Sequence, residues 1–120
     1  MPELVTVTTD DDCLLDGAYW PGNDAAVERT ATRADACLLI HGATSNAFSP
    51  LQRTIAQALA EAGVAVLSLS TRGHDVVSRL HRPDALEYGG VAFEDLDDAP
   101  RDLHAGVRWL QAQGHQRVML

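Results

Sequence analysis

The segment with the clearest potential for chemistry is ACLLIHGATSNAF, residues 36–48, in which an apolar run meets a histidine and a glycine. The run at 36–40 is typical of a strand buried on both faces of a parallel sheet. Ligands of such sheets bind at the carboxyl ends of the strands, where the loop beginning at His41 lies. Gly42 permits a sharp turn, and the small Ala43 leaves its backbone N–H open. The loop therefore predicts a donor aimed into a pocket, although His-Gly is equally compatible with a simple turn.

The other reactive side chains form no recognisable catalytic set. None of the five serines lies in a Gly-x-Ser-x-Gly setting, and Ser49 is better explained as a helix cap. The chain has no lysine, which excludes a phosphate-binding or Schiff-base lysine within it. The histidines outside the loop lack ligand-like spacing with cysteines or carboxylates, so we predict no metal site.

Two acidic runs and two cysteines have structural interpretations. Residues 10–12 and 94–98 are most simply solvated charges at a turn and at a helix start, where the helix dipole favours them. Cys13 and Cys37 lie in apolar, strand-like runs, which favours buried, reduced thiols over a disulfide. Neither feature therefore predicts a catalytic role.

Composition limits the classes of partner. The 120 residues are 46% apolar, enough for one globular core, and carry a formal net charge of −8. Such a charge repels phosphate backbones and anionic membrane surfaces, so we expect neither nucleic acid nor membrane as a partner. The first residues have no basic region, and no apolar run approaches the roughly 20 residues of a membrane span. We therefore expect a cytoplasmic protein.

The elements before residue 71 alternate between strand and helix. Residues 3–9 and 13–20 predict a hairpin that ends at Pro21 and Gly22, and the polar segment 23–35 predicts a surface connection. After the strand at 36–40, residues 49–63 predict a helix, because Ser49, Pro50 and Gln52 have a capping-box arrangement and Gly63 is a natural stop. The spacing of its apolar residues predicts one buried face, formed by Leu51, Ile55, Leu59 and Ala62. Residues 64–70 predict a second buried strand, parallel to the first.

The remaining elements continue the alternation. Residues 71–97 are too irregular for a long element and predict a loop excursion. A helix follows, capped by Asp97 or Asp98 with Pro100 in its first turn, and Gly114 ends it. Its buried stripe is expected to contain Leu103, Val107 and Leu110. Residues 116–120 begin a further strand. The predicted fold is an α/β sheet that is cut off at its last strand.

The loop resembles the Gly-rich turn of the short-chain dehydrogenases, which commonly reads Leu-Leu-Ile-Thr-Gly-Ala-Thr-Ser-Gly-x-Gly. If the chain were such a dehydrogenase, Arg72 after the next strand would suggest NADP, the dinucleotide that carries an additional phosphate. However, Asn46 and Phe48 stand where glycines let the backbone approach the pyrophosphate. Residues 1–35 also precede a motif that normally opens a dehydrogenase, so this family remains the alternative.

Nearly the whole chain resembles the first half of an α/β hydrolase. The family begins with an antiparallel hairpin, a buried strand, a His-Gly oxyanion loop, a helix and a strand ending in Arg-Gly-His, and a variable segment, a helix and the strand before the nucleophile follow. The matching segments of this chain are VTTDDDCLLDGAYWPG, CLLIHGA, SPLQRTIAQALAEAG, VAVLSLSTRGHD, DLHAGVRWLQAQG and RVML. Asp75 replaces the glycine that usually follows Arg-Gly-His.

The resemblance implies a serine-type hydrolase of esters or related acyl compounds, with a small-molecule substrate and no cofactor. Its oxyanion-hole donor is the Ala43 N–H, with Gly42 and His41 supporting the loop. Thr44, His74 and the loop at 88–93 are expected to line the substrate pocket. The family's nucleophile, acid and base come later, so residues 1–120 would be a partial domain, inactive alone and truncated before the nucleophile turn.

Two matters stay open at this level. A non-catalytic binding module on the same fold would also keep the His-Gly loop, and fold does not fix function. The sequence does not define the substrate or the oligomeric state.

The first prediction concerns the gene. We expect the codons after Leu120 to encode Gly-x-Ser-x-Gly or a close variant within a few residues, because the strand at 116–120 matches the strand before the nucleophile. Sequencing the surrounding DNA tests this. A stop codon or a continuation without serine would contradict it.

Overall fold

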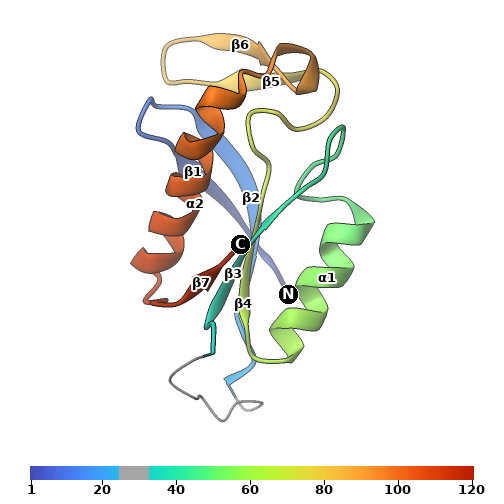
Figure 1. Ribbon diagram of the computed structural model, residues 1–120, viewed down its shortest axis with the longest axis vertical. Helices are drawn as coiled ribbons and strands as arrows, with labels where there is room; N and C mark the ends of the chain where they lie inside the picture. Colours follow the sequence, from blue (N-terminus) through green and yellow to red (C-terminus); the bar gives the residue numbers. More distant parts are fainter. Residues whose placement is uncertain (25–32) are drawn as a thin grey trace.

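The computed structural model describes residues 1–24 and 33–120 as one twisted sheet with a helix on each face (Figure 1). The predicted surface connection at 23–35 lies largely outside the described residues. Within the described residues, seven strands form the sheet, in the order β6-β5-β2-β4-β3-β7, with β1 paired to β2. The sheet is mixed, as the sequence predicts.

The N-terminal strands form the predicted antiparallel hairpin. Strand β1 (Glu3–Thr8) pairs with β2 (Leu14–Trp20) along its whole length. At the turn, the Thr9 N–H donates to the Cys13 carbonyl at 2.9 Å, and Asp12 has a φ of 63°. Aspartate tolerates this left-handed conformation better than most residues, which is one reason for an acidic turn.

The buried strands are parallel and lie at the centre of the sheet. Strand β3 (Ala36–Ile40) pairs with β4 (Ala65–Leu69) on one side and with β7 (Val118–Met119) on the other, parallel in both cases. The predicted crossover between β3 and β4 is confirmed. Among the described residues, β7 has no strand on its outer side.

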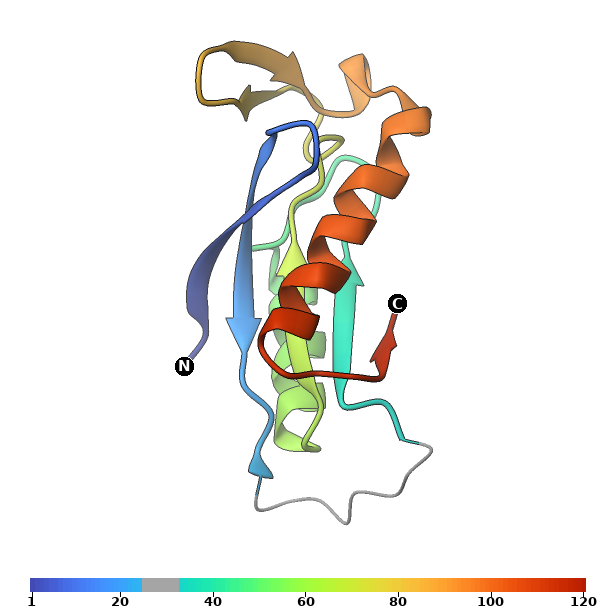
Figure 2. The same cartoon turned by 90° about the vertical axis from the view of Figure 1, so that its left-hand side faces the viewer.

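Alternate residues of the strands face two separate cores. Figure 2 shows one helix in front of the sheet and the other behind it. Leu38 and Leu67 face α2 (Ala99–Ala112), whereas Cys37 and Val66 face α1 (Pro50–Glu61). This period of two, with both faces covered, explains why the strands read as continuous apolar runs. The cysteines lie in different cores and are free and buried, as predicted.

Helix α1 has the predicted ends. The Ser49 hydroxyl accepts a hydrogen bond from the Gln52 N–H at 3.4 Å, and Pro50 is the first helical residue. Gly63 has a φ of 88° and ends the helix. The sequence therefore encodes both ends of α1 locally.

The buried stripe of α1 is not the predicted one. We expected the face formed by Leu51, Ile55, Leu59 and Ala62. The structure instead buries Gln52, Ala56 and Ala60. Leu51 is 67% exposed, and Ile55 and Leu59 are only partly buried. The small residues at 56 and 60 let the helix approach Trp20 and Val66 closely, so the larger side chains flank the contact.

Helix α2 begins directly after the predicted cap residue, but the side chain of that residue does not cap the helix. Asp98 precedes the helix but makes no capping hydrogen bond. Its carboxylate pairs instead with Arg72 at 3.6 Å and with Arg101 at 3.5 Å. Gly114, with a φ of 97°, ends the helix as predicted. Leu110 is buried as expected, and Leu103 and Val107 pack partly buried against the same core.

Residues 71–97 contain regular structure that the sequence analysis did not predict. Strands β5 (Ser78–His81) and β6 (Leu86–Gly89) form a hairpin, closed by a hydrogen bond from the Arg82 N–H to the Ala85 carbonyl at 3.1 Å. Each strand has four residues, too few for a hydrophobic period to be recognised. Two short turns of 3₁₀ helix follow, η2 (Val91–Phe93) and η3 (Leu96–Asp98).

The second prediction concerns the contact between α2 and the sheet. A Cβ at Gly106 would lie 2.7 Å from Cδ1 of the fully buried Leu38. We expect Gly106→Val to lower the free energy of unfolding by about 1–3 kcal/mol through overpacking, measured by urea denaturation. Ala112→Val, on the exposed face of the same helix, should cost about 0.5 kcal/mol or less. Equal losses in the two variants would contradict the close contact.

Candidate active site

A pocket of about 300 Å³ lies at the carboxyl ends of β3 and β4, where the sequence predicts the site. The loop after β3 contributes His41, Gly42 and Ala43. Thr71 and Gly73 line the pocket from the loop after β4, and Val91 and Glu94 belong to the segment that leads to α2. Three of the five predicted site residues therefore come together in one pocket.

The backbone N–H of Ala43 is a free donor in this pocket. No acceptor among the described residues is hydrogen-bonded to it, and Ala43 is exposed. The loop turns differently from the way we predicted, because the left-handed residue is Thr44, with a φ of 62°, and not Gly42. A Cβ at Gly42 would meet nothing within 4 Å. Thr44 is exposed and is not among the residues that line the pocket.

The side chain of His41 holds the loop by two hydrogen bonds. The Thr71 N–H donates to Nε2 of His41 at 3.2 Å, and Nδ1 lies 2.9 Å from the Gly42 carbonyl oxygen. A backbone N–H can only donate, so Nε2 is the acceptor and Nδ1 carries the proton that it donates to Gly42. This arrangement selects one neutral tautomer of His41.

The second predicted histidine lies beside the first but outside the lining of the pocket. Nδ1 of His74 is 2.7 Å from the Thr71 carbonyl oxygen, and its ring centroid lies 6.5 Å from that of His41. The next residue, Asp75, has a φ of 58° and donates its N–H to the Ser45 carbonyl at 2.8 Å. Aspartate thus supplies the left-handed conformation that glycine would adopt there.

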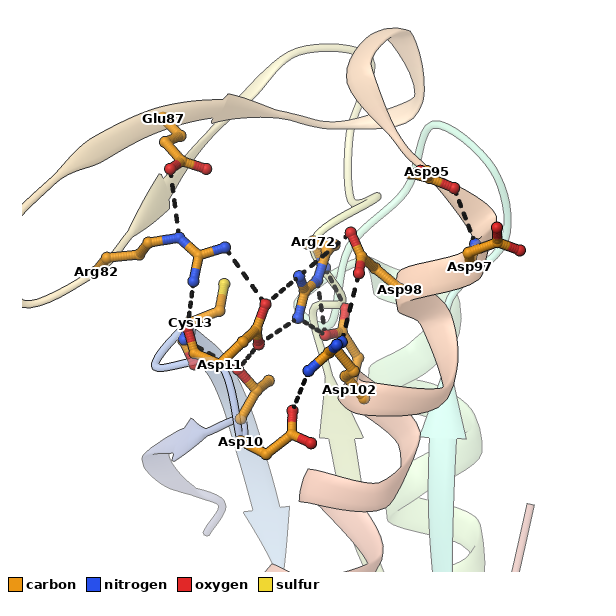
Figure 3. A network of polar contacts seen from close by, with 12 residues as sticks. Asp10, Asp11, Cys13, Arg72, Arg82, Glu87, Asp95, Asp97, Asp98 and Asp102 are labelled. Carbon is orange, nitrogen blue, oxygen red and sulfur yellow. Dashed lines mark hydrogen bonds and ion pairs between the residues drawn. The ribbon is translucent and has the colours of Figure 1, made fainter.

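A cluster of charged residues around Arg72, which lies between the pocket-lining residues Thr71 and Gly73, was not predicted from the sequence (Figure 3). The Arg72 guanidinium is 6% exposed and contacts Asp102, which is fully buried, at 2.8 Å and Asp11 at 2.9 Å. Asp102 also accepts the Arg72 backbone N–H at 2.8 Å. Arg82 joins the cluster through the Asp11 carboxylate at 3.4 Å. One arginine therefore connects the β1–β2 turn, α2 and the loop after β4.

The interpretation of residues 10–12 as solvated charges is wrong for Asp11. Its side chain is 25% exposed, and the hydrogen bonds from Arg72 hold the pKa of its carboxyl well below the usual range, against the opposing effect of burial. The Arg72 pKa is raised in turn, mainly by its hydrogen bond to Asp11. Asp98 is also paired. The only sign of this cluster in the sequence was Arg72 in the Arg-Gly pair after β4. Its carboxylate partners Asp11 and Asp102 lie 61 and 30 residues away along the chain.

The loop at 88–93 contributes to the pocket through Val91. Tyr88 and Phe93 stack on each other with ring centroids 5.7 Å apart, and both side chains are mostly exposed.

Among the described residues, no cluster of histidine, cysteine and carboxylate side chains is arranged to hold a metal ion, and no helix is long and apolar enough to cross a bilayer.

Comparison with known proteins identifies the fold. No protein-family model and no curated protein matches the sequence. Among solved structures, the esterase Pf2001 of Pyrococcus furiosus matches with a TM-score of 0.63 at 24% identity, covering 98% of this chain and 38% of that chain. The α/β hydrolase GrgF from Penicillium sp. sh18 matches with a TM-score of 0.62 at 18% identity, covering 99% of this chain and 34% of that one.

These similarities show that the chain has the α/β-hydrolase fold, as its sequence predicts. The matched part is an antiparallel hairpin followed by parallel strands with crossover helices. The chain spans little more than a third of the length of the two proteins.

The third prediction concerns Asp11. We expect Asp11→Asn to lower the free energy of unfolding at neutral pH by about 1.5–3 kcal/mol, because it removes a carboxylate that accepts hydrogen bonds from Arg72. The folded-state pKa of Asp11 is depressed, so its stabilisation is fully present above the ordinary aspartate pKa of about 3.9 and is lost as the pH falls below it. Denaturation of both proteins at several pH values measures this.

Asp10→Asn is the control, because Asp10 pairs with Arg101 at the exposed surface and should contribute little. A difference between wild type and Asp11→Asn that stays constant from pH 7 to pH 3 would contradict the assignment.

Proposed function

We propose that the chain is the N-terminal part of a serine-type α/β hydrolase that cleaves esters or related acyl compounds, and that Ala43 supplies one oxyanion-hole donor. The observation that carries the proposal is the Ala43 N–H, which has no acceptor among the described residues and lies on a pocket at the carboxyl ends of parallel strands. Free donors held in fixed positions are what a tetrahedral oxyanion requires.

The register of the sheet supports a nucleophile near this donor. Met119 of β7 lies opposite Cys37 of β3, so three further residues would bring the strand level with Ile40. A turn after that point would emerge beside His41 to Ala43, because parallel neighbouring strands end at the same edge. In the α/β-hydrolase family the nucleophile lies on that turn, so we expect the serine of this protein there, with the acid and the base later in the chain.

The reaction that this site fits is acyl transfer to water. The serine gives its proton to the base and attacks the carbonyl carbon of the substrate, and the tetrahedral oxyanion accepts a hydrogen bond from the Ala43 N–H. Collapse of this intermediate expels the alcohol, which takes the proton from the base, and water then attacks the acyl-enzyme to release the acid and restore the serine. His41 fixes the Gly42 carbonyl and so orients the donor.

The predicted roles of Thr44 and His74 in substrate binding remain part of the proposal, with a small-molecule substrate and no cofactor. The free, buried cysteines favour a cytoplasmic protein.

The alternatives make different predictions for the full-length protein. A non-catalytic binding module would not react with a fluorophosphonate probe, which labels an activated serine. A dinucleotide-binding protein would change NADPH fluorescence on titration. We expect labelling by the probe and no change with NADPH.

The fourth prediction tests the donor itself. In the full-length protein, Ala43→Pro removes the N–H, and kcat for an activated ester such as p-nitrophenyl acetate should fall roughly 10²-fold. Ala43→Gly keeps the N–H and is the matched control, with kcat expected within a few-fold of the wild type. Unchanged turnover in a folded Ala43→Pro variant would place the oxyanion hole elsewhere.

A further inference from the structure

A continuous series of hydrogen bonds runs from the buried charge cluster to the donor peptide in the pocket. It begins where Asp102 accepts the Arg72 backbone N–H at 2.8 Å and the Arg72 Nε–H at 2.9 Å. One fully buried carboxylate thus fixes both the main chain and the side chain of Arg72. The peptide that it holds is the one between Thr71 and Arg72.

The same peptide is also held from its other side. The Thr71 carbonyl accepts hydrogen bonds from the His74 backbone N–H at 2.9 Å and from His74 Nδ1 at 2.7 Å. With its N–H on Asp102 and its carbonyl on His74, this peptide cannot rotate without breaking three hydrogen bonds. The position of Thr71 is therefore set by Asp102 of α2 on one side and by His74 of its own loop on the other.

Thr71 in turn contacts the side chain of His41, which lines the pocket. The Thr71 N–H donates to Nε2 of His41 at 3.2 Å, and the Thr71 hydroxyl lies at the same distance from Nε2. Nδ1 of His41 then donates to the Gly42 carbonyl at 2.9 Å. The Gly42 carbonyl and the Ala43 N–H belong to one planar trans peptide, so fixing the carbonyl aims the N–H in the opposite direction.

We infer that Arg72 and Asp102 are positioning residues for the oxyanion donor, acting through Thr71 and His41. This inference rests on the proposed function. It assigns the buried cluster a role beyond stability, since the ion pair connects α2 and the β1–β2 turn to the orientation of one peptide in the pocket. A displacement of about 1 Å at a reacting group is enough to cost roughly 10²-fold in rate.

The test is a double-mutant cycle in the full-length protein, with kcat and KM for p-nitrophenyl acetate as readouts. We expect Asp102→Asn to lower kcat roughly 10- to 100-fold with little change in KM. In a His41→Ala background the same substitution should lower kcat less than about twofold, because the path to the donor is already broken. Arg101→Ala removes two exposed ion pairs of the same region, to Asp10 and to Asp98, but leaves the contacts of Arg72 with Asp102 and Asp11 in place, so kcat should be unchanged in both backgrounds.

Equal losses of kcat in both backgrounds would overturn the inference while leaving the hydrolase proposal intact, whereas an inactive wild type would overturn the proposal. Because Asp102 is buried and its variant could fail to fold, Asp11→Asn serves as a second variant that loosens Arg72 from the partly exposed side.

A readout independent of activity is the NMR spectrum. Asp102→Asn, or Asp11→Asn in its place, should shift the Ala43 amide signal and change the tautomer balance of His41. An unchanged Ala43 amide in a folded variant would contradict the inference even if the protein hydrolyses no ester.

Discussion

The buried pair of Arg72 and Asp102 is the interaction on which the arrangement of the site depends. A guanidinium that is 6% exposed requires partners for its charge and its donors, and Asp102 and Asp11 supply them from two distant parts of the chain. Breaking such a pair by removing one partner typically costs about 3–5 kcal/mol, because it leaves an uncompensated buried charge. Helix α2 and the β1–β2 turn are therefore connected through the residue that follows Thr71.

Two residues in the loops after β3 and β4 have left-handed backbone conformations, which are unfavourable for residues other than glycine. Thr44 is β-branched and has a φ of 62°, and Asp75 has a φ of 58°. Residues in such conformations persist only where surrounding contacts determine them, and they concentrate at functional sites. Here the contacts are the bond from the Asp75 N–H to Ser45 and the bond from Asn46 Nδ2 to the Asp75 carboxylate at 2.9 Å. Two loops from neighbouring strands thus hold each other.

The sequence was sufficient for features with local causes and insufficient for those with distant ones. The ends of α1 and the strands at 36–40 and 65–69 follow from Ser49, Gly63 and apolar runs, all readable within a few residues. The hairpin at 78–89 was missed because its strands are too short for a period. The buried face of α1 was misassigned because small residues, not large ones, make the closest approach. Arg72 contacts residues up to 61 positions away along the chain, which no local pattern shows.

The most direct test of the account is a crystal structure of the full-length protein inhibited by a phosphonate, whose phosphoryl oxygen occupies the place of the tetrahedral oxyanion. This oxygen should lie about 2.7–3.1 Å from the Ala43 nitrogen, with His41 still hydrogen-bonded to the Gly42 carbonyl. A phosphonate bound without contact to Ala43, or attached to a residue far from the loop at 41–43, would contradict it.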